Sequence, residues 1–262
     1  MPSTRPRRSE DLTDTFRPVA RATLQESIYE QVCAALMDGR LRPGQKISLR
    51  SLAAAMDTSP MPVREALRRL EASHVLELRG GGVLAVPAPS PDELQEIREI
   101  RVSLEGLAAE RAAARMTRKQ QDRTARLARE MHLFADAEDF TGFLAMNREF
   151  HFSIYEASQS PLLLSIIKSL WLRVAPFFFA ICRLHGHVDF SIEQHDRAVQ
   201  ALLRRDGAGA RAAIQADIER AIARIGTLLA TVGAAEEGAA TRPAATRPRH
   251  APRPLTARSG RL

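Results

Sequence analysis

The sequence predicts a mostly α-helical protein in two parts, an N-terminal winged helix-turn-helix followed by an all-helical bundle. Within residues 41–86, two short helical patterns precede two apolar runs that flank a glycine-rich turn. After Pro91, apolar residues recur with helical period to about residue 232, without a convincing strand. The order of elements in residues 41–86 is typical of DNA-binding domains, so double-stranded DNA is the leading partner.

Composition divides the 262 residues into four parts. Residues 23–87 form the expected DNA-binding domain, and residues 88–232 form the expected helical domain. Residues 1–22 and 233–262 are rich in Arg, Pro and Ala and carry most of the net charge of +7. Because they have few large apolar groups, we expect both ends to be disordered. Such arms either strengthen DNA binding non-specifically through counterion release or are inert extensions.

The helix-turn-helix is predicted from two serine caps. Ser48 can cap a helix that runs to Met56, and Ser59 followed by Pro60 can open a second helix. Apolar positions lie on one side of this second helix, namely Val63, Ala66, Leu67 and Leu70. Three arginines largely avoid that side, namely Arg64, Arg68 and Arg69. A helix packed by one face can present such arginines to the phosphates and guanine edges of the major groove.

The wing is predicted from residues 75–86. Val75-Leu76-Glu77-Leu78 and Val83-Leu84-Ala85-Val86 read as two short strands around Arg79-Gly80-Gly81-Gly82. The glycines permit positive φ and a close approach of the backbone to another molecule. A wing of this kind can lie on a DNA backbone.

The block from about residue 27 to residue 86 resembles the GntR family of bacterial transcription regulators. The resemblance rests on Pro43-Gly44, on Pro62-Val63-Arg64-Glu65-Ala66-Leu67 and on the glycines of the wing. It implies DNA contacts at four positions, namely Arg50, Ser59, Arg64 and Gly81. It also implies a dimer on a palindromic operator.

One departure from the family pattern concerns the start of the second helix. The family commonly has an arginine before its Thr-Pro-Val-Arg sequence, whereas this chain has Pro60 followed by Met61. Proline has no donor, so one specific contact is lost in each half-site, worth roughly 1–3 kcal/mol of base discrimination. Arg64, Arg68 or Arg79 could compensate, and we expect the operator to differ from the family's usual sequence.

The helical domain begins with Ser90-Pro91-Asp92-Glu93, which predicts a capping box and a long helix to about Met116. Further helices are predicted at about residues 118–137, 140–158, 161–185, 191–205 and 207–232. Arg101 falls within the apolar stripe of the first helix, where it needs an anionic partner. That partner is either Glu105 one turn later or the carboxylate of a ligand. Arg173 is a second candidate for the effector pocket.

Four residues form a candidate ligand set in the bundle, namely Asn147, His151, His195 and Asp217. Asn147 and His151 are four residues apart and share a helix face. On spacing alone, a histidine among Phe150, Ile154 and Tyr155 is more often a core residue than a metal ligand.

Residues 91–232 resemble the FCD domain of the FadR-type branch of GntR regulators, which often holds a divalent metal through one aspartate and three histidines. Phe150-His151 and His195 match two of the histidines, whereas Asn147 stands in place of the aspartate and Asp217 in place of the third histidine. The resemblance therefore implies an altered site for Zn, Ni or Mn, in which the carboxylate has moved to another helix. A metal-free pocket for an anionic effector is the alternative.

Together, the two family resemblances imply a cytoplasmic, homodimeric regulator that represses a metabolic operon and responds to a small carboxylate. Two histidines and a carboxylate also occur in non-heme iron enzymes, but no general base or nucleophile pair accompanies them here, so we expect no enzyme. The longest apolar run, residues 174–182, is too short to span a membrane. A constitutive DNA-binding protein whose helical domain only dimerises is the competing interpretation.

Overall fold

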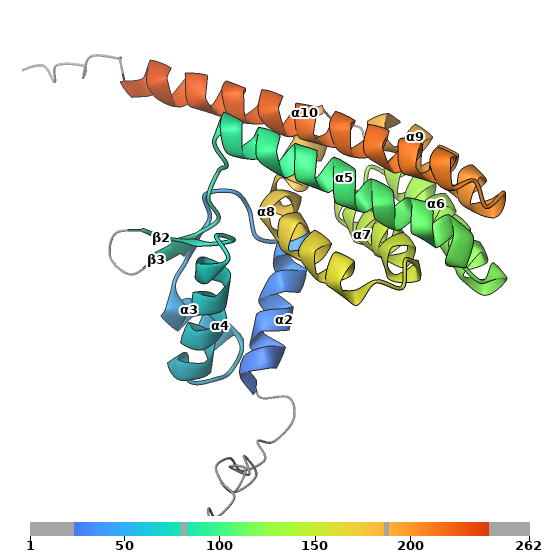
Figure 1. The fold of residues 1–262 in the computed structure, drawn as a ribbon. Helices are drawn as coiled ribbons and strands as arrows, with labels where there is room; N and C mark the ends of the chain where they lie inside the picture. Colours follow the sequence, from blue (N-terminus) through green and yellow to red (C-terminus); the bar gives the residue numbers. More distant parts are fainter. Residues whose placement is uncertain (1–23, 80–82, 186–188, 241–262) are drawn as a thin grey trace, which may run out of the picture.

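The computed structural model describes residues 24–79, 83–185 and 189–240, and it confirms the predicted fold class (Figure 1). The first domain contains helices α2 (Leu24–Met37), α3 (Leu49–Ala55) and α4 (Pro60–Ala72). Its three strands are β1 (Lys46–Ile47), β2 (Glu77–Arg79) and β3 (Val83–Ala85). They pair antiparallel in the order β1-β3-β2. This is a winged helix-turn-helix.

The helix pair forms as the serine caps predict, with one correction. The hydroxyl of Ser48 accepts a hydrogen bond from the Ser51 N–H at 3.0 Å, which caps α3. Ser59 occupies the N-cap position of α4 with extended backbone, but its side chain makes no capping bond, so that part of the prediction is wrong. Pro60 at the first helical position removes one N–H that would otherwise need a partner. The apolar face of α4 is buried, with no residue of the predicted set more than 1% exposed.

The sheet differs from the prediction in two respects, namely where β2 begins and the presence of the additional strand β1. The N–H groups of Val75 and Leu76 bond to the Leu70 carbonyl, so these two residues close α4 and enter the core instead of opening β2. Strand β1 was not predicted, because two residues give no readable alternation. The glycines at 80–82, including Gly81, lie outside the described residues.

The second domain is a bundle of six helices within the described ranges, namely α5 (Pro91–Arg115), α6 (Arg118–Asp136), α7 (Phe140–Ala157), α8 (Pro161–His185), α9 (Asp189–Leu203) and α10 (Gly207–Ala240). Helices α5 and α10 lie side by side along one face of the bundle (Figure 1). The capping box predicted at Ser90 and Glu93 is present, and Thr117 and Gln120 form a second one. These caps satisfy free backbone N–H groups and fix where α5 and α6 begin.

The C-terminal boundary of the bundle is corrected. The predicted disordered tail starts at residue 233, whereas the backbone of α10 stays helical to Ala240. Alanine has the highest helix propensity, and four of residues 234–240 are alanines. The first proline after this stretch is Pro243. Residues 1–22 and the rest of the tail lie outside the described residues.

Helix α8 joins the two domains. Leu172 is 5% exposed and belongs to the core of the DNA-binding domain, whereas Trp171 is 1% exposed and belongs to the core of the bundle. A second contact between the domains is an ion pair, in which Arg148 of α7 lies 3.2 Å from Asp38 after α2. One helix therefore packs into both hydrophobic cores.

By length and apolar composition alone, α8 could cross a membrane over Pro161–Leu184, and it is the one helix in the described part of the chain with this property. The expectation drawn from the shorter run 174–182 is therefore corrected. Half of the apolar window is buried, and Val174 and Phe177 are completely so. Packing within the protein accounts for the hydrophobic character of this helix.

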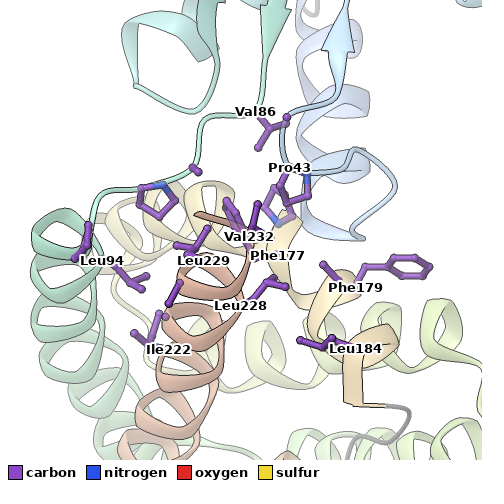
Figure 2. A pocket seen from close by; sticks show the side chains of 18 of the residues that line it. Pro43, Val86, Leu94, Phe177, Phe179, Leu184, Ile222, Leu228, Leu229 and Val232 are labelled. Atoms are coloured by element: carbon purple, nitrogen blue, oxygen red, sulfur yellow. The ribbon is translucent and has the colours of Figure 1, made fainter. Parts of the chain in front are cut away.

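A groove of about 1370 Å³ separates the domains elsewhere (Figure 2). Leu94 of α5, Phe177 of α8 and Leu229 of α10 line it from the bundle, and Pro43 and Val86 line it from the DNA-binding domain. Because this space lies between the domains, a change in their relative orientation would open or close it.

Candidate functional sites

The exposed face of α4 carries the arginines expected to read DNA. Arg64 is exposed, and so is Arg50 on α3. Within the described ranges neither guanidinium has a carboxylate partner. Ser59 is exposed at the start of α4. The predicted contact residues on α3 and α4 are therefore accessible.

Two other predicted arginines are held by weak ion pairs. Arg68 pairs with Glu65 at 3.2 Å, and Arg79 pairs with Glu77 at 2.5 Å. All four side chains are at least two-fifths exposed, so these pairs contribute little and a phosphate can replace the carboxylate.

Arg69, in contrast, is occupied within the domain. Its guanidinium donates to Glu26 at 2.5 Å and lies over the Tyr29 ring, 3.7 Å from the ring centroid. These contacts link α4 to α2, because both partners of Arg69 lie on α2.

In the bundle, the structure brings together three of the four predicted ligands. Nε2 of His151 on α7 lies 3.2 Å from Nε2 of His195 on α9. Asp217 on α10 places one carboxylate oxygen 3.3 Å from the first nitrogen and the other 3.4 Å from the second. All three side chains are buried, and their ligand atoms lie within 4.8 Å of one another.

These separations suit a central ion. Ligand atoms about 2.0–2.1 Å from a metal at tetrahedral angles are about 3.3–3.4 Å apart, close to the distances that separate the three groups. Two imidazoles and a carboxylate form a mixed N/O donor set that suits Zn, Ni or Mn. The residues present therefore fit a divalent metal.

Burial and charge set the protonation of this cluster. Burial lowers the pKa of His151, although the neighbouring Asp217 carboxylate acts in the opposite direction. Burial alone would raise the pKa of Asp217, but the adjacent His195 and His151 rings hold it well below its ordinary value. A neutral imidazole beside an ionised carboxylate is the state that a metal requires.

A hydrogen-bond relay fixes the tautomer of His151. The Tyr155 hydroxyl donates its single proton to the Glu105 carboxylate at 2.5 Å. It must therefore accept from Nδ1–H of His151, which lies 3.0 Å away. With the proton on Nδ1, neutral His151 directs the lone pair of Nε2 towards Asp217 and His195. Sequence reasoning missed Tyr155, although its spacing of four residues from His151 places both on one helix face.

Glu105 is the centre of this relay. Its carboxylate also accepts from Arg101 Nε at 2.6 Å and from the Trp171 indole at 3.0 Å. Of the two partners expected for Arg101, the structure therefore supplies the internal one. Burial disfavours the charged guanidinium, yet Glu105 outweighs it and raises the pKa of Arg101. Nη1 of Arg101 is buried and has no hydrogen-bond partner among the described residues, so its N–H groups are available to a ligand.

Asn147 and Arg101 line a cavity of about 30 Å³ together with His151 and Asp217. That volume holds an ion or a water molecule but no organic acid. Asn147 is 8% exposed and shares this cavity, so its amide oxygen is a candidate fourth ligand.

Arg173 is not in this pocket. It pairs with Glu93 near the start of α5 and lines a separate depression beside His74 and Pro89. The expectation that it faces the effector is corrected, because consecutive residues of α8 point in different directions and Arg173 follows Leu172 towards the DNA-binding domain.

Comparisons with known proteins agree on both domains. The profile of bacterial regulatory proteins of the gntR family matches residues 24–86, and the FCD domain profile matches residues 96–220. The transcriptional regulator McbR of Escherichia coli is 29% identical over 175 residues, which are 66% of this chain and 79% of McbR. A probable D-xylose utilization operon repressor of Paenarthrobacter nicotinovorans is 29% identical over 188 residues, covering 72% of this chain and 82% of that protein.

A solved structure of E. coli McbR superposes with a TM-score of 0.74 at 26% identity, covering 79% of this chain and 99% of that one. The two-domain arrangement is therefore shared with a known regulator.

Proposed function

Because this chain belongs to the GntR family of bacterial regulatory proteins and carries an FCD domain, we propose that it is a ligand-responsive repressor of a metabolic operon. It acts in the cytoplasm as a homodimer whose two winged helices bind a palindromic operator. These two relatives are regulators of transcription and not enzymes. The exposed arginine face of α4 is the observation that carries this proposal.

The three-residue cluster is the proposed metal site. His151, His195 and Asp217 hold a divalent ion, with Asn147 as a fourth donor. When bound, such an ion supplies open coordination positions for a carboxylate. Arg101 lines the same cavity and has an unpartnered Nη1 amino group, so the proposed effector is a small organic acid.

Effector binding must enlarge the cavity, because about 30 Å³ is too small for an organic acid. Trp171 packs against the His151 ring with 5.2 Å between centroids, so it moves when this cavity opens. The next residue, Leu172, lies in the core of the DNA-binding domain. We therefore propose that α8 transmits the effector signal, and a coupling of roughly 1–3 kcal/mol would weaken operator binding about 5- to 150-fold.

Two experiments test this function. Selection of random double-stranded DNA with the full-length protein should yield a palindrome, and failure to enrich any sequence would contradict specific DNA binding. A thermal-shift screen of small carboxylates against the metal-loaded protein should then find one that raises the melting temperature and releases the selected DNA. A protein that binds its palindrome but responds to none of these acids would favour the alternative, a constitutive regulator whose helical domain only dimerises.

A further inference from the structure

The first turn of α4 exposes an apolar side chain beside its arginines. Met61 is 63% exposed. Arg64, Glu65 and Arg68 follow it by three, four and seven residues, so all four lie along one side of the helix. A single exposed methionine needs no explanation in general. Here its place matters, since the N-terminal residues of the second helix in a helix-turn-helix contact base edges.

The chemistry at this end of α4 is mainly apolar. Pro60 has neither an N–H nor a polar side chain to offer. Arg64, one turn later, is the first residue of α4 with a charged side chain. The part of α4 that enters a groove first therefore presents a thioether.

Among the base edges of the major groove, thymine alone carries an exposed methyl group. A methionine side chain is long, flexible and polarisable, which lets it pack on such a group without strict geometry. We propose that Met61 reads a thymine in each half-site by packing on its 5-methyl group, while Arg64 contacts a neighbouring guanine or phosphate. This inference rests on the proposed function, because it requires α4 to enter the major groove.

The size of the effect follows from the area of one methyl group. Burying a methyl-sized apolar group changes affinity about fourfold. Deoxyuridine differs from thymidine only by lacking this methyl and keeps every hydrogen-bonding group. Replacing one thymine by deoxyuridine therefore isolates the proposed contact.

The test uses the palindrome selected with the full-length protein. Each thymine of a half-site is replaced singly by deoxyuridine, and binding is measured by fluorescence anisotropy at fixed salt. Wild-type protein should lose about fourfold in affinity at one thymine. Met61→Ala should bind the thymine and uracil operators equally, and so should Met61→Gln, which keeps the length of the side chain but not its apolar end. Leu133→Ala removes a 69% exposed leucine of α6 and is the matched control that should behave as wild type.

Three results are distinguishable. Sensitivity to one thymine methyl that is lost in both Met61 variants supports the proposal. Specific binding without any methyl-sensitive thymine, or with sensitivity that persists in Met61→Ala, overturns the proposal and leaves the proposed function intact. Failure of the wild-type protein to select any sequence overturns the proposed function and this inference with it.

Discussion

Trp171 and Leu172 are consecutive residues of α8, yet their side chains are buried in different domains. Trp171 donates to Glu105 and packs against His151 in the bundle, whereas Leu172 completes the core of the DNA-binding domain. Neither is more than 5% exposed. Close-packed cores leave little room for a side chain to move without moving its neighbours. A displacement of Trp171 in the bundle should therefore displace Leu172 in the DNA-binding domain.

Leu172→Ala should therefore uncouple the two domains. Truncation of a buried leucine costs about 2–5 kcal/mol, and here the lost packing lies between α8 and the DNA-binding domain. We expect unchanged metal content but a smaller effect of the effector on operator affinity. Leu163→Ala is the matched control, because Leu163 is a buried leucine of the same helix that belongs to the hydrophobic core of the bundle. Equal loss of coupling in both variants would contradict a specific role for Leu172.

Arg64→Ala should weaken specific DNA binding about 5- to 150-fold for each half-site, since a guanidinium that contacts a base is worth roughly 1–3 kcal/mol. Dimerisation, measured by sedimentation, should not change. Arg69→Ala serves as a control on the same helix, because the Arg69 guanidinium contacts Glu26 and Tyr29 of α2 whereas that of Arg64 has no carboxylate partner within the described ranges. An operator affinity that falls more in Arg69→Ala than in Arg64→Ala would reverse the assignment.

Tyr155→Phe should weaken metal binding about 10- to 100-fold by removing the hydroxyl that orients His151. The same change leaves the Glu105 carboxylate and His151 Nδ1–H without this partner, so we expect about 1–3 kcal/mol less stability. Competition with a chromophoric chelator and chemical denaturation measure the two effects. Tyr29→Phe, in the other domain, should leave metal affinity at the wild-type value.

Asn147→Asp should tighten metal binding, because a carboxylate binds a divalent ion more strongly than an amide oxygen does. Chelator competition on the full-length protein checks it. Equal affinities of the variant and the wild type would show that residue 147 does not touch the ion, although it lines the cavity.

The helices were largely predictable because their signals are local. Ser90 with Glu93 marks the start of α5, and the proline at 161 marks the start of α8. The face of α4 follows from four apolar residues at helical spacing. The two-residue strand β1 carries no such local signal, and its pairing with β3 is a tertiary contact.

The site was predictable only in part. Spacing places Asn147 and His151 on one face, and the approach of His195 and Asp217 was expected only from the resemblance to FCD domains. The direction of the Arg173 side chain depends on how α8 packs between the two domains, and this tertiary arrangement cannot be derived from the local sequence pattern. The role of Trp171 was missed for the same reason, since its partner Glu105 lies 66 residues away in the chain.

Metal content tests the central claim about the helical domain most directly. Full-length protein purified without a histidine tag is analysed by inductively coupled plasma mass spectrometry, beside the His151→Ala/His195→Ala variant. We predict nearly one divalent ion per chain in the wild type and none in the variant. Absence of metal from the wild type even after supplementation with Zn, Ni and Mn would contradict the claim, and the cluster of His151, His195 and Asp217 would then be a metal-free structural network.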